Sequence, residues 1–357
     1  MYGPSKQAIS SLLAVILLVA GLTSCSPTSS TNIPGTSTPT STLSVSHPES
    51  GTCLSSHDQF PYANIQVSHD RYLAHSEPML AEDPENPLHL VGGSKFFTDL
   101  VHYRFKIGYF TSFDGGCTWM DGGLLPGFGA DVLTSDPTFA FGTNHEVYAA
   151  VLNAVDNGES GISVFTSNDG GKTFGSPVSV FTDTTGRVFS DKPWITVDQT
   201  EGPHRGFIYV VWSYDHGGDC GLGNLCSQEL AFSRSTDGGK TFSRVQLIEG
   251  HTPFCTNPAT GRPANATTCD QTTGAIPVVE PDGTVVVTFP YSDPMSGPIP
   301  TRMLVTTSPD GGTSWTSPVL VATIHDIYGI FPPEHYRNLS LPAFACDPKT
   351  TLPHLVR

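Results

Sequence analysis

Short runs of aliphatic, β-branched and aromatic residues follow one another along the chain from about residue 76 onward. The clearest of them read LHLVGG, EVYAAV, FIYVVWSY and TVVVTFPY. Such runs, bounded by turn residues, are typical of strands. After Leu22, no stretch keeps apolar residues at a 3.6-residue spacing for three helical turns. The chain also contains 36 Gly and 30 Pro, which implies many turns. The pattern therefore predicts an all-β protein.

A turn motif of the form S-x-D-G-G-x-[TS]-[WF] recurs between these runs. Its copies are FTSFDGGCTW, FTSNDGGKTF, FSRSTDGGKTF and VTTSPDGGTSW, with aspartates Asp114, Asp169, Asp237 and Asp310 and aromatic residues Trp119, Phe174, Phe242 and Trp315. A short carboxylate can accept hydrogen bonds from the N–H groups of a tight turn, and a Gly pair supplies positive φ angles. The aromatic residue can then pack between neighbouring units. We expect the motif to be structural rather than catalytic.

Each turn belongs to a longer repeated unit. A proline phrase opens the unit, a β-rich run follows, a third run leads into the D-G-G turn, and a fourth run follows the aromatic residue. The prolines are Pro78, Pro137, Pro193, Pro277 and Pro342. The first four precede the motif aspartates by 36, 32, 44 and 33 residues, and units recur every 56 to 84 residues. Four-stranded antiparallel units at this spacing are typical of propeller blades.

The repeated turn resembles the Asp-box of the sialidase-like superfamily, and the resemblance covers nearly everything from Ser76 onward. It implies a β-propeller of four-stranded antiparallel blades, with Asp-box hairpins that join the third and fourth strands of each blade at the periphery. Four complete units and a partial fifth are present. Since such propellers close with about six blades, we expect a truncated six- or seven-bladed propeller. The alternative is a complete small propeller whose last blade is finished by residues near 51–68.

The first residues form a separate segment. Lys6 precedes an apolar run from Ala8 to Leu22, which is too short to span a membrane, and Leu22-Thr23-Ser24-Cys25 resembles a bacterial lipobox. We expect a lipoprotein signal peptide over residues 1–24, with Cys25 lipidated, and an extracytoplasmic protein anchored at the bacterial cell surface. An ordinary secretory signal peptide is the alternative. Residues 25–52 read as a Ser/Thr/Pro-rich tether, which leaves 53–357 for the propeller.

Net charge and cysteine content narrow the possible partners. The net charge of −16 would repel nucleic acid and anionic lipid, so membrane contact is expected through the lipid alone. Eight cysteines in an exported protein favour disulfides. Cys220 with Cys226 and Cys255 with Cys269 are the local pairs, Cys53 with Cys117 is a further one, and Cys346 is left over. A zinc site of His216, Cys220 and Cys226 is the alternative for the first pair. No cofactor is expected; calcium in the acid-rich loops is the alternative, and no D-x-D-x-D-G string supports it.

Candidate binding residues lie where the resemblance places the face opposite the Asp-boxes. The acids before the prolines, Glu77, Asp136 and Asp191, would ring the channel mouth, unless they only form local turn hydrogen bonds. Long insertions on the same face span residues 93–104, 214–228, 249–274 and 290–302. Their chemistry-bearing residues are Asp99, Tyr103, Arg104, Asp215, His216, Arg262, Tyr291, Asp293 and Arg302. Arg262 is counted with the binding residues, and Asp99, Arg104, Tyr291 and Arg302 are weak catalytic candidates.

The resemblance to sialidases breaks down where the substrate would bind. Sialidases hold the substrate carboxylate with three arginines, the first in an Arg-Ile-Pro phrase at the start of blade one. Here that phrase is SEPML, with Glu77 before Pro78 and no arginine nearer than Arg71. An acid at this position would repel a carboxylate. The predicted function is therefore recognition of glycans or other surface polymers. The alternatives are an exo-glycosidase with a changed arginine pattern and a non-catalytic scaffold that binds proteins.

Overall fold

The computed structural model describes residues 65–217, 225–255, 269–270, 272–292, 300–325, 341–346 and 353–356. All of them belong to the second of two units, Pro48–Arg357, while the first unit is Met1–His47. Within the described ranges every regular element is a β-strand, which confirms the all-β prediction. No helix in these ranges has the length and apolar character needed to cross a membrane.

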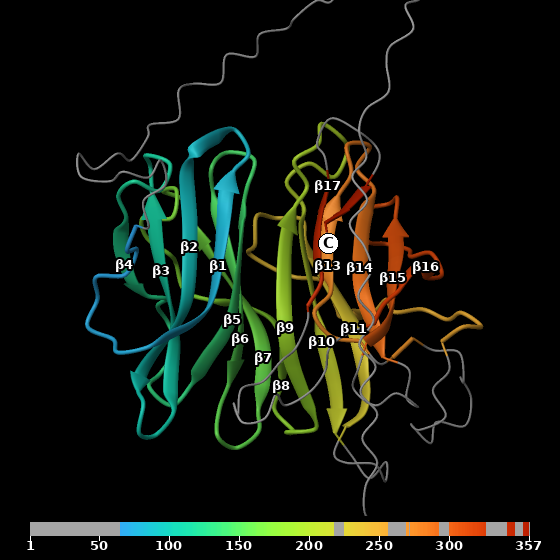
Figure 1. The fold of residues 1–357 in the computed structure, drawn as a ribbon, viewed down its shortest axis with the longest axis horizontal. Coiled ribbons are helices and arrows are strands. Elements are labelled where there is room, and N and C mark those ends of the chain that lie inside the picture. Colours follow the sequence, from blue (N-terminus) through green and yellow to red (C-terminus); the bar gives the residue numbers. More distant parts are fainter. Residues whose placement is uncertain are drawn as a thin grey trace, which may run out of the picture. The chain divides into compact units, whose positions relative to one another are not determined.

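The strands form four four-stranded antiparallel sheets and one two-stranded sheet (Figure 1). Blade 1 contains β1 (His75–Asp83), β2 (Asn86–Asp99), β3 (Arg104–Ser112) and β4 (Met120–Leu124). Blade 2 contains β5 (Leu133–Phe141), β6 (Val147–Ala154), β7 (Ser160–Ser167) and β8 (Val178–Asp183). Blade 3 contains β9 (Val188–Val197), β10 (Ile208–Gly217), β11 (Leu225–Ser235) and β12 (Gln246–Leu247). Blade 4 contains β13 (Ile276–Val279), β14 (Val285–Ser292), β15 (Pro300–Ser308) and β16 (Val319–Thr323), and β17 (Ala343–Cys346) pairs with β18 (Pro353–Val356).

The order within each complete sheet is that of a meander, as the repeated unit predicts. The first strands of successive sheets contact one another: β1 with β5, β5 with β9, β9 with β13 and β13 with β17. These first strands therefore line the axis of the molecule, and the sheets are the blades of a β-propeller. In the described ranges, four complete blades and two strands of a fifth confirm the predicted propeller of four-stranded antiparallel blades.

Three apolar clusters hold the blades together. The cluster between blades 1 and 2 contains Val91 and Phe165. The cluster between blades 2 and 3 contains Val164 and Val210. The cluster between blades 3 and 4 contains Val211 and Val287. Alternate residues of one strand, such as Val210 and Val211, therefore serve two different interfaces. Because both faces of an inner blade are covered, its strands read as continuous apolar runs rather than as an alternating pattern.

The four S-x-D-G-G turns have one geometry. In each, the Asp Oδ1 accepts hydrogen bonds from a Ser hydroxyl at 2.7–2.8 Å and from a backbone N–H four residues later at 2.9 Å, while Oδ2 accepts a hydroxyl at 2.6 Å. The carboxylates are Asp114, Asp169, Asp237 and Asp310. All four turns join the third and fourth strands of a blade. Their oxygens are occupied by local donors, so the geometry gives them a role in shaping the turn.

The aromatic residues after the second, third and fourth turns pack on the preceding blade. The ring of Phe174 in blade 2 lies 4.8 Å from that of Tyr109 in blade 1, and Trp315 in blade 4 lies 4.9 Å from Phe232 in blade 3. Phe242 packs against the cluster between blades 2 and 3. These rings add apolar area to interfaces that the strands already form.

Candidate functional site

The first strands of blades 1 to 3 share a bulge at the proline phrase. Their pairing with the second strands shifts between Ser76 and Met79 in β1 and between Ser135 and Thr138 in β5, and β9 shifts in the same way before Trp194. At each bulge the residue before the proline has a left-handed backbone: Glu77 with φ 56°, Asp136 with φ 51° and Lys192 with φ 48°. A residue before proline normally avoids helical backbone conformations. Three repeats of this costly conformation mark the position as one that the fold holds in place.

The fourth blade has Gly274 at the equivalent position. Val279 pairs with Val285 as Val197 pairs with Ile208, and Gly274 and Lys192 each lie five residues before these positions. Gly274 also has a positive φ, 72°. The proline phrase at Pro277 is therefore two positions out of step with the phrases of the other blades, and Ala275 stands where they have proline.

The ring position in blade 3 corrects one prediction. The residue before Pro193 is Lys192, and Asp191 lies one position earlier, where blades 1 and 2 have Ser76 and Ser135. Asp191 Oδ1 accepts a hydrogen bond from the backbone N–H of Lys192 at 2.9 Å, which is the local turn bond of the alternative interpretation. The prediction of an all-acidic ring is therefore wrong in blade 3, where the ring residue is the cation Lys192. The prediction took the nearest acid, Asp191, although the residue directly before the proline holds the ring position.

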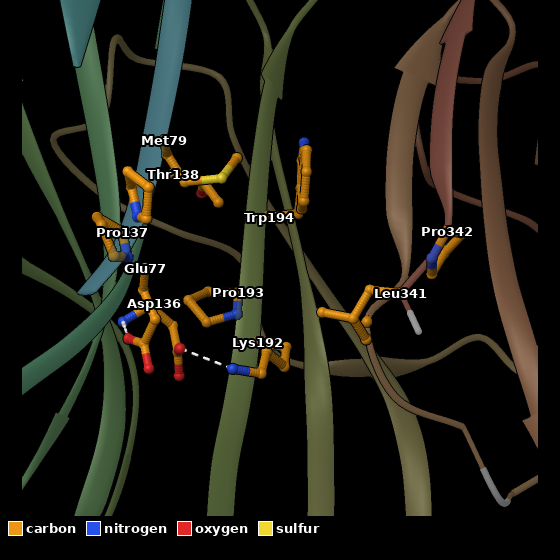
Figure 2. A pocket seen from close by; sticks show the side chains of 12 residues that line it. Glu77, Met79, Asp136, Pro137, Thr138, Lys192, Pro193, Trp194, Leu341 and Pro342 are labelled. Carbon is orange, nitrogen blue, oxygen red and sulfur yellow. Dashed lines mark hydrogen bonds and ion pairs between the residues drawn. The ribbon is translucent and has the colours of Figure 1, made fainter. Parts of the chain in front are cut away.

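These positions surround a cavity of about 190 Å³ on the axis. Figure 2 shows side chains from the first strands of three blades and from the segment before β17 converging on it. The apolar part of its wall comes from Met79, Trp194, Leu341 and the neighbouring proline rings. Its polar part comes from the ring residues of blades 1 to 3 and from Thr138.

Each ring residue of blades 1 to 3 takes part in an ion pair. Lys95 Nζ in β2 lies 2.7 Å from Glu77 Oε1. Figure 2 shows the second pair, in which Lys192 Nζ lies 2.7 Å from Asp136 Oδ1. The second oxygen of Glu77 accepts hydrogen bonds from Ser135 Oγ at 2.9 Å and from the Asp136 N–H at 3.2 Å. Glu77 thus ties blade 1 to blade 2, and Lys192 ties blade 3 to blade 2.

The surroundings of the two cavity carboxyls shift their pKa values in opposite directions. Burial raises the pKa of Glu77, but the hydrogen bond and charge of Lys95 outweigh it and bring the pKa to about 2. Burial, followed by the charge of Asp191, raises the pKa of Asp136 to about 7, against the opposing effect of Lys192. Burial lowers the pKa of Lys192, but the charges of Asp136 and Asp191 outweigh burial, so its pKa is raised and the ammonium stays charged.

Several buried hydroxyl oxygens beside the cavity have no hydrogen-bond partner in the described part of the chain. They belong to Ser76, Thr138, Ser190 and Thr272. Thr138 lines the cavity, and the others lie within two residues of a ring position. A buried polar group without a partner is destabilising, and buried hydroxyls in native proteins normally bond to protein, water or ligand. The site therefore has hydrogen-bonding capacity that the described residues do not use.

The weak catalytic candidates occupy two separate places, neither of them in the cavity wall. Asp99 and Arg104 pair at the β2–β3 hairpin of blade 1, where Asp99 binds His102 at 2.7 Å and Arg104 forms an ion pair with Asp156 of blade 2. In blade 4, Tyr291 is fully buried and Arg302 lies over its ring. Burial removes Tyr291 from any role as an accessible nucleophile.

Three of the four long insertions begin as strands rather than loops. β2 and β3 cover all of 93–104 except the hairpin turn, β10 and β11 extend into 214–228, and β14 and β15 extend into 290–302. Tyr103 is exposed in the first hairpin turn, and His216 in β10 lies 3.1 Å from Glu229. Arg262 and Asp293 lie outside the described residues.

Cysteine chemistry is described for part of the chain. Cys255 and Cys269 form the predicted disulfide. Cys117 is disulfide-bonded, and its expected partner, Cys53, lies outside the described residues. The same holds for Cys220, so neither the Cys220–Cys226 pair nor the zinc alternative can be placed. In the described ranges, no group of three or more His, Cys, Asp or Glu side chains has the arrangement of a metal site.

Sequence reasoning missed several residues of the site, among them Lys192, Lys95, Trp194 and Thr138. Trp194 and Thr138 directly follow ring prolines, so the repeated phrase contained a signal for them. Lys95 had no such signal, because it lies 18 residues from Glu77 and reaches it only through the pairing of β1 with β2.

Comparisons with known proteins bear on the fold alone. No protein-family model matches the chain, and no curated protein matches it. Among solved structures, a Dyadobacter fermentans protein of unknown function aligns with a TM-score of 0.48 at 15% identity, covering 71% of each chain. The leech intramolecular trans-sialidase has a TM-score of 0.48 at 12% identity, covering 72% of this chain and 53% of the enzyme. The Ruminococcus gnavus intramolecular trans-sialidase gives the same TM-score and identity, covering 72% and 73%. Similarities at this level assign no activity.

Proposed function

We propose that this protein is an extracytoplasmic, lipid-anchored propeller that binds a sugar unit of a glycan or surface polymer in its axial cavity. The observation that carries the proposal is the composition of the cavity wall. An apolar surface that includes Trp194 faces the partly buried carboxyl groups of Glu77 and Asp136 and a buried hydroxyl, Thr138, that has no partner among the described residues.

A sugar ring matches both parts of this wall. Its C–H faces are apolar and pack on aromatic and aliphatic surfaces, while its hydroxyls donate and accept hydrogen bonds in several directions. Trp194 and Met79 would supply the first kind of contact, and Thr138 and the carboxyl of Asp136 the second. Ligand sites of this kind are mostly apolar with a few polar groups that fix orientation. A ligand hydroxyl on Thr138 would remove the penalty of its unpaired oxygen.

The size of the cavity limits what it can hold. At about 190 Å³ it is smaller than the roughly 300 to 1,000 Å³ of typical sites for drug-sized ligands. A single sugar residue fits such a volume better than an internal stretch of polysaccharide. We therefore propose recognition of a terminal unit.

A second candidate function is glycoside hydrolysis in the same cavity. It is favoured by the separation of acidities, with Glu77 at a pKa of about 2 and Asp136 at about 7, because carboxyl groups pushed apart in this way suit acid and base roles. Each carboxyl is paired with a lysine, however: Glu77 with Lys95 and Asp136 with Lys192. Neither lysine is therefore free to bind a substrate carboxylate. Binding therefore remains the primary proposal, and a panel of fluorogenic glycosides tests hydrolysis directly.

Glycan-array binding with cavity variants tests the primary proposal. We expect the protein to bind a subset of glycans that share one terminal sugar, and Trp194→Ala to weaken that binding by about threefold to tenfold. Thr138→Val, which keeps the shape and removes the hydroxyl, should weaken it to a similar degree. Trp119→Ala is the matched control, since Trp119 lies on the first Asp-box turn and outside the cavity wall. Unchanged binding by Trp194→Ala would contradict the site, and an array without any bound glycan would favour the scaffold alternative.

Export and anchoring are part of the same proposal. The disulfide between Cys255 and Cys269 supports an oxidising compartment, since structural disulfides are rare in the cytosol. The lipobox-like sequence ending at Cys25 supports lipidation there. A propeller held at a cell surface by a Ser/Thr/Pro-rich tether would have access to extracellular polymers.

A further inference from the structure

We infer that the sugar unit bound in the axial cavity is uncharged and has a methyl group where a hexose has a hydroxymethyl group, so that the ligand class is a 6-deoxyhexose. This inference rests on the proposed function. It comes from a division of the cavity wall into a polar side and an apolar side. The polar side comprises Glu77, Asp136, Thr138 and Lys192, and the apolar side comprises Gly274, Leu341 and Pro342. Met79, Trp194 and the prolines of blades 1 to 3 form the rest of the wall.

The apolar side lies at the ring position of blade 4 and in the segment before β17. Gly274 holds the ring position of blade 4, and Leu341 stands directly before Pro342, as the ring residues of blades 1 to 3 stand before their prolines. A Cβ built on Gly274 would lie 2.6 Å from Leu341 Cδ2, so the leucine side chain fills the space next to the glycine. The side chains of these three residues contain no hydrogen-bonding atom. They therefore offer apolar surface and no side-chain partner for a ligand hydroxyl.

The polar side lies on the first strands of blades 1 to 3, apart from the apolar side. Figure 2 shows Asp136 and Thr138 separated from Leu341, with the side chain of Pro193 between them in this view. Thr138 is 4% exposed, and its hydroxyl has no hydrogen-bond partner among the described residues. A ligand hydroxyl on this side would therefore gain a partner and would satisfy a buried group of the protein.

The charged side chains of the described wall are already paired within the protein. They are Glu77, which pairs with Lys95, and Asp136, which pairs with Lys192. The second oxygen of Glu77 accepts hydrogen bonds from Ser135 Oγ and from the Asp136 N–H. A ligand carboxylate or ammonium would have to break one of these pairs and enter a largely apolar cavity, which is costly for a charged group. An uncharged sugar avoids this cost.

A 6-deoxyhexose has the same division as the cavity wall. When its ring hydroxyls face Thr138 and the polar side, another edge of the ring faces Leu341 and Pro342. The hydroxymethyl oxygen of a hexose would lose its hydrogen bonds to water at this edge, whereas a methyl group would bury apolar area. An acetamido group also ends in a methyl group, but its amide N–H and C=O both need partners that the apolar side chains do not supply. The wall therefore favours the 6-deoxy sugar over both.

Calorimetric titration of the full chain with sugars that differ only at C6 tests the inference. The pairs are fucose with galactose, rhamnose with mannose and quinovose with glucose, each within one enantiomeric series, together with the matching uronates and N-acetylhexosamines. At pH 8, Asp136, whose pKa is about 7, is ionised and paired with Lys192. We expect one 6-deoxyhexose to bind about tenfold or more tightly than its parent hexose, and the uronate to bind most weakly.

The outcomes separate this inference from the proposed function. Equal affinity within every pair, or tighter binding of a uronate or an N-acetylhexosamine, would overturn the inference and leave the proposed function standing. The same holds if none of these sugars binds while a glycan array shows bound glycans. No binding by any sugar, together with an array without bound glycans, would overturn both.

Leu341→Gln assigns the preference to the apolar side. Glutamine is close to leucine in size and would present an amide to the C6 edge, so we expect affinity for the parent hexose to rise about threefold or more and affinity for the 6-deoxyhexose to fall. A rise in affinity cannot come from a loss of folding. Leu100→Gln is the matched control, since Leu341 is 44% exposed and Leu100, in the β2–β3 turn outside the cavity wall, is 49% exposed. An unchanged preference in Leu341→Gln would overturn the inference.

Discussion

At the scale of single residues, a buried carboxylate between two histidines joins blade 1 to blade 2. Asp83 is 1% exposed, and its Oδ2 lies 2.5 Å from His145 Nδ1 and 3.3 Å from His89 Nδ1. His89 Nε2 lies 2.8 Å from the Gly170 carbonyl of the second Asp-box turn. Burial raises the pKa of Asp83, but hydrogen bonds from the Glu85 N–H and from His145 outweigh it, so the pKa is lowered. The hydrogen bond to Asp83, with the charges of Asp83, Glu85 and Glu146, raises the pKa of His145.

These shifts predict a pH window for stability. Asp83, with a lowered pKa, contributes stability above its unfolded pKa of about 4, and this is lost as the pH falls through the folded value. His145, with a raised pKa, contributes stability below its unfolded pKa of about 6.5, and this is lost as the pH rises through the folded value. The contact is therefore fully effective between about pH 4 and 6.5.

Urea unfolding of wild type and His145→Gln between pH 5.5 and 8.5 checks this window. We expect the midpoint of the wild type to fall over this range and the fall to be smaller in the variant. Asp136, Asp215 and Glu249, whose pKa values are raised to about 7, contribute to the same fall in both proteins, so only the difference reports on His145. His102→Gln is the control, since His102 pairs with an exposed acid on a hairpin. Equal slopes in wild type and His145→Gln would contradict the prediction.

At the scale of elements, the second, third and fourth Asp-box turns are each both a hairpin and a contact to the preceding blade. In the fourth turn, the Gly312 carbonyl accepts a hydrogen bond from Gln246 Nε2 of blade 3 at 3.1 Å. Gly312 has φ 82°, and a Cβ there would lie 2.3 Å from the ring of Phe232. Glycine is therefore required twice, once by the backbone and once by the close approach of the ring.

Alanine substitution separates these two requirements. Gly123 in β4 also has a positive φ, 75°, but a Cβ there would meet no atom within 4 Å. We expect Gly123→Ala to cost about 1 to 2 kcal/mol of unfolding free energy through the backbone alone. Gly312→Ala should cost about 1 to 3 kcal/mol more, because the added methyl group overpacks the interface between blades 3 and 4. Equal losses, measured by denaturant unfolding, would show that the ring moves aside freely.

At the scale of the whole molecule, the chain combines an acidic propeller with a proposed lipid anchor. The net charge of −16 gives the protein no electrostatic attraction to anionic bilayers. The two acyl chains, rather than attraction between basic residues and lipid headgroups, would then hold the protein at the membrane.

Replacement of Cys25 tests this arrangement. We expect Cys25→Ser to move the protein from the membrane fraction to the soluble fraction after cell lysis, because the acyl chains are lost. Cys346→Ser is the matched control, since it changes another cysteine within the propeller, and it should leave the protein with the membranes. Retention of Cys25→Ser in membranes washed at high salt would contradict lipid anchoring.

The sequence by itself determined the all-β class, the repeated four-stranded unit and the four Asp-box turns. These features are local: a strand is specified by a short run of residues, and a D-G-G turn by a carboxylate and two glycines within a few positions. The same local character explains why the disulfide between Cys255 and Cys269, 14 residues apart, could be predicted.

The tertiary structure alone decided which residues form the site. The sequence phrase offered Asp191 as a ring residue and aligned Pro277 with the prolines of the other units, whereas strand register gives Lys192 and Gly274 as the ring positions of blades 3 and 4. Lys95 reaches Glu77 through strand pairing, and Lys192 reaches Asp136 from a different blade. The burial of the Asp215 carboxyl likewise appears only when blade 3 packs against its neighbours. Contacts of this kind depend on strand register and on packing between blades. The alternation of side chains along a strand specifies neither, because a register shift of one residue moves every side chain to the opposite face of the sheet.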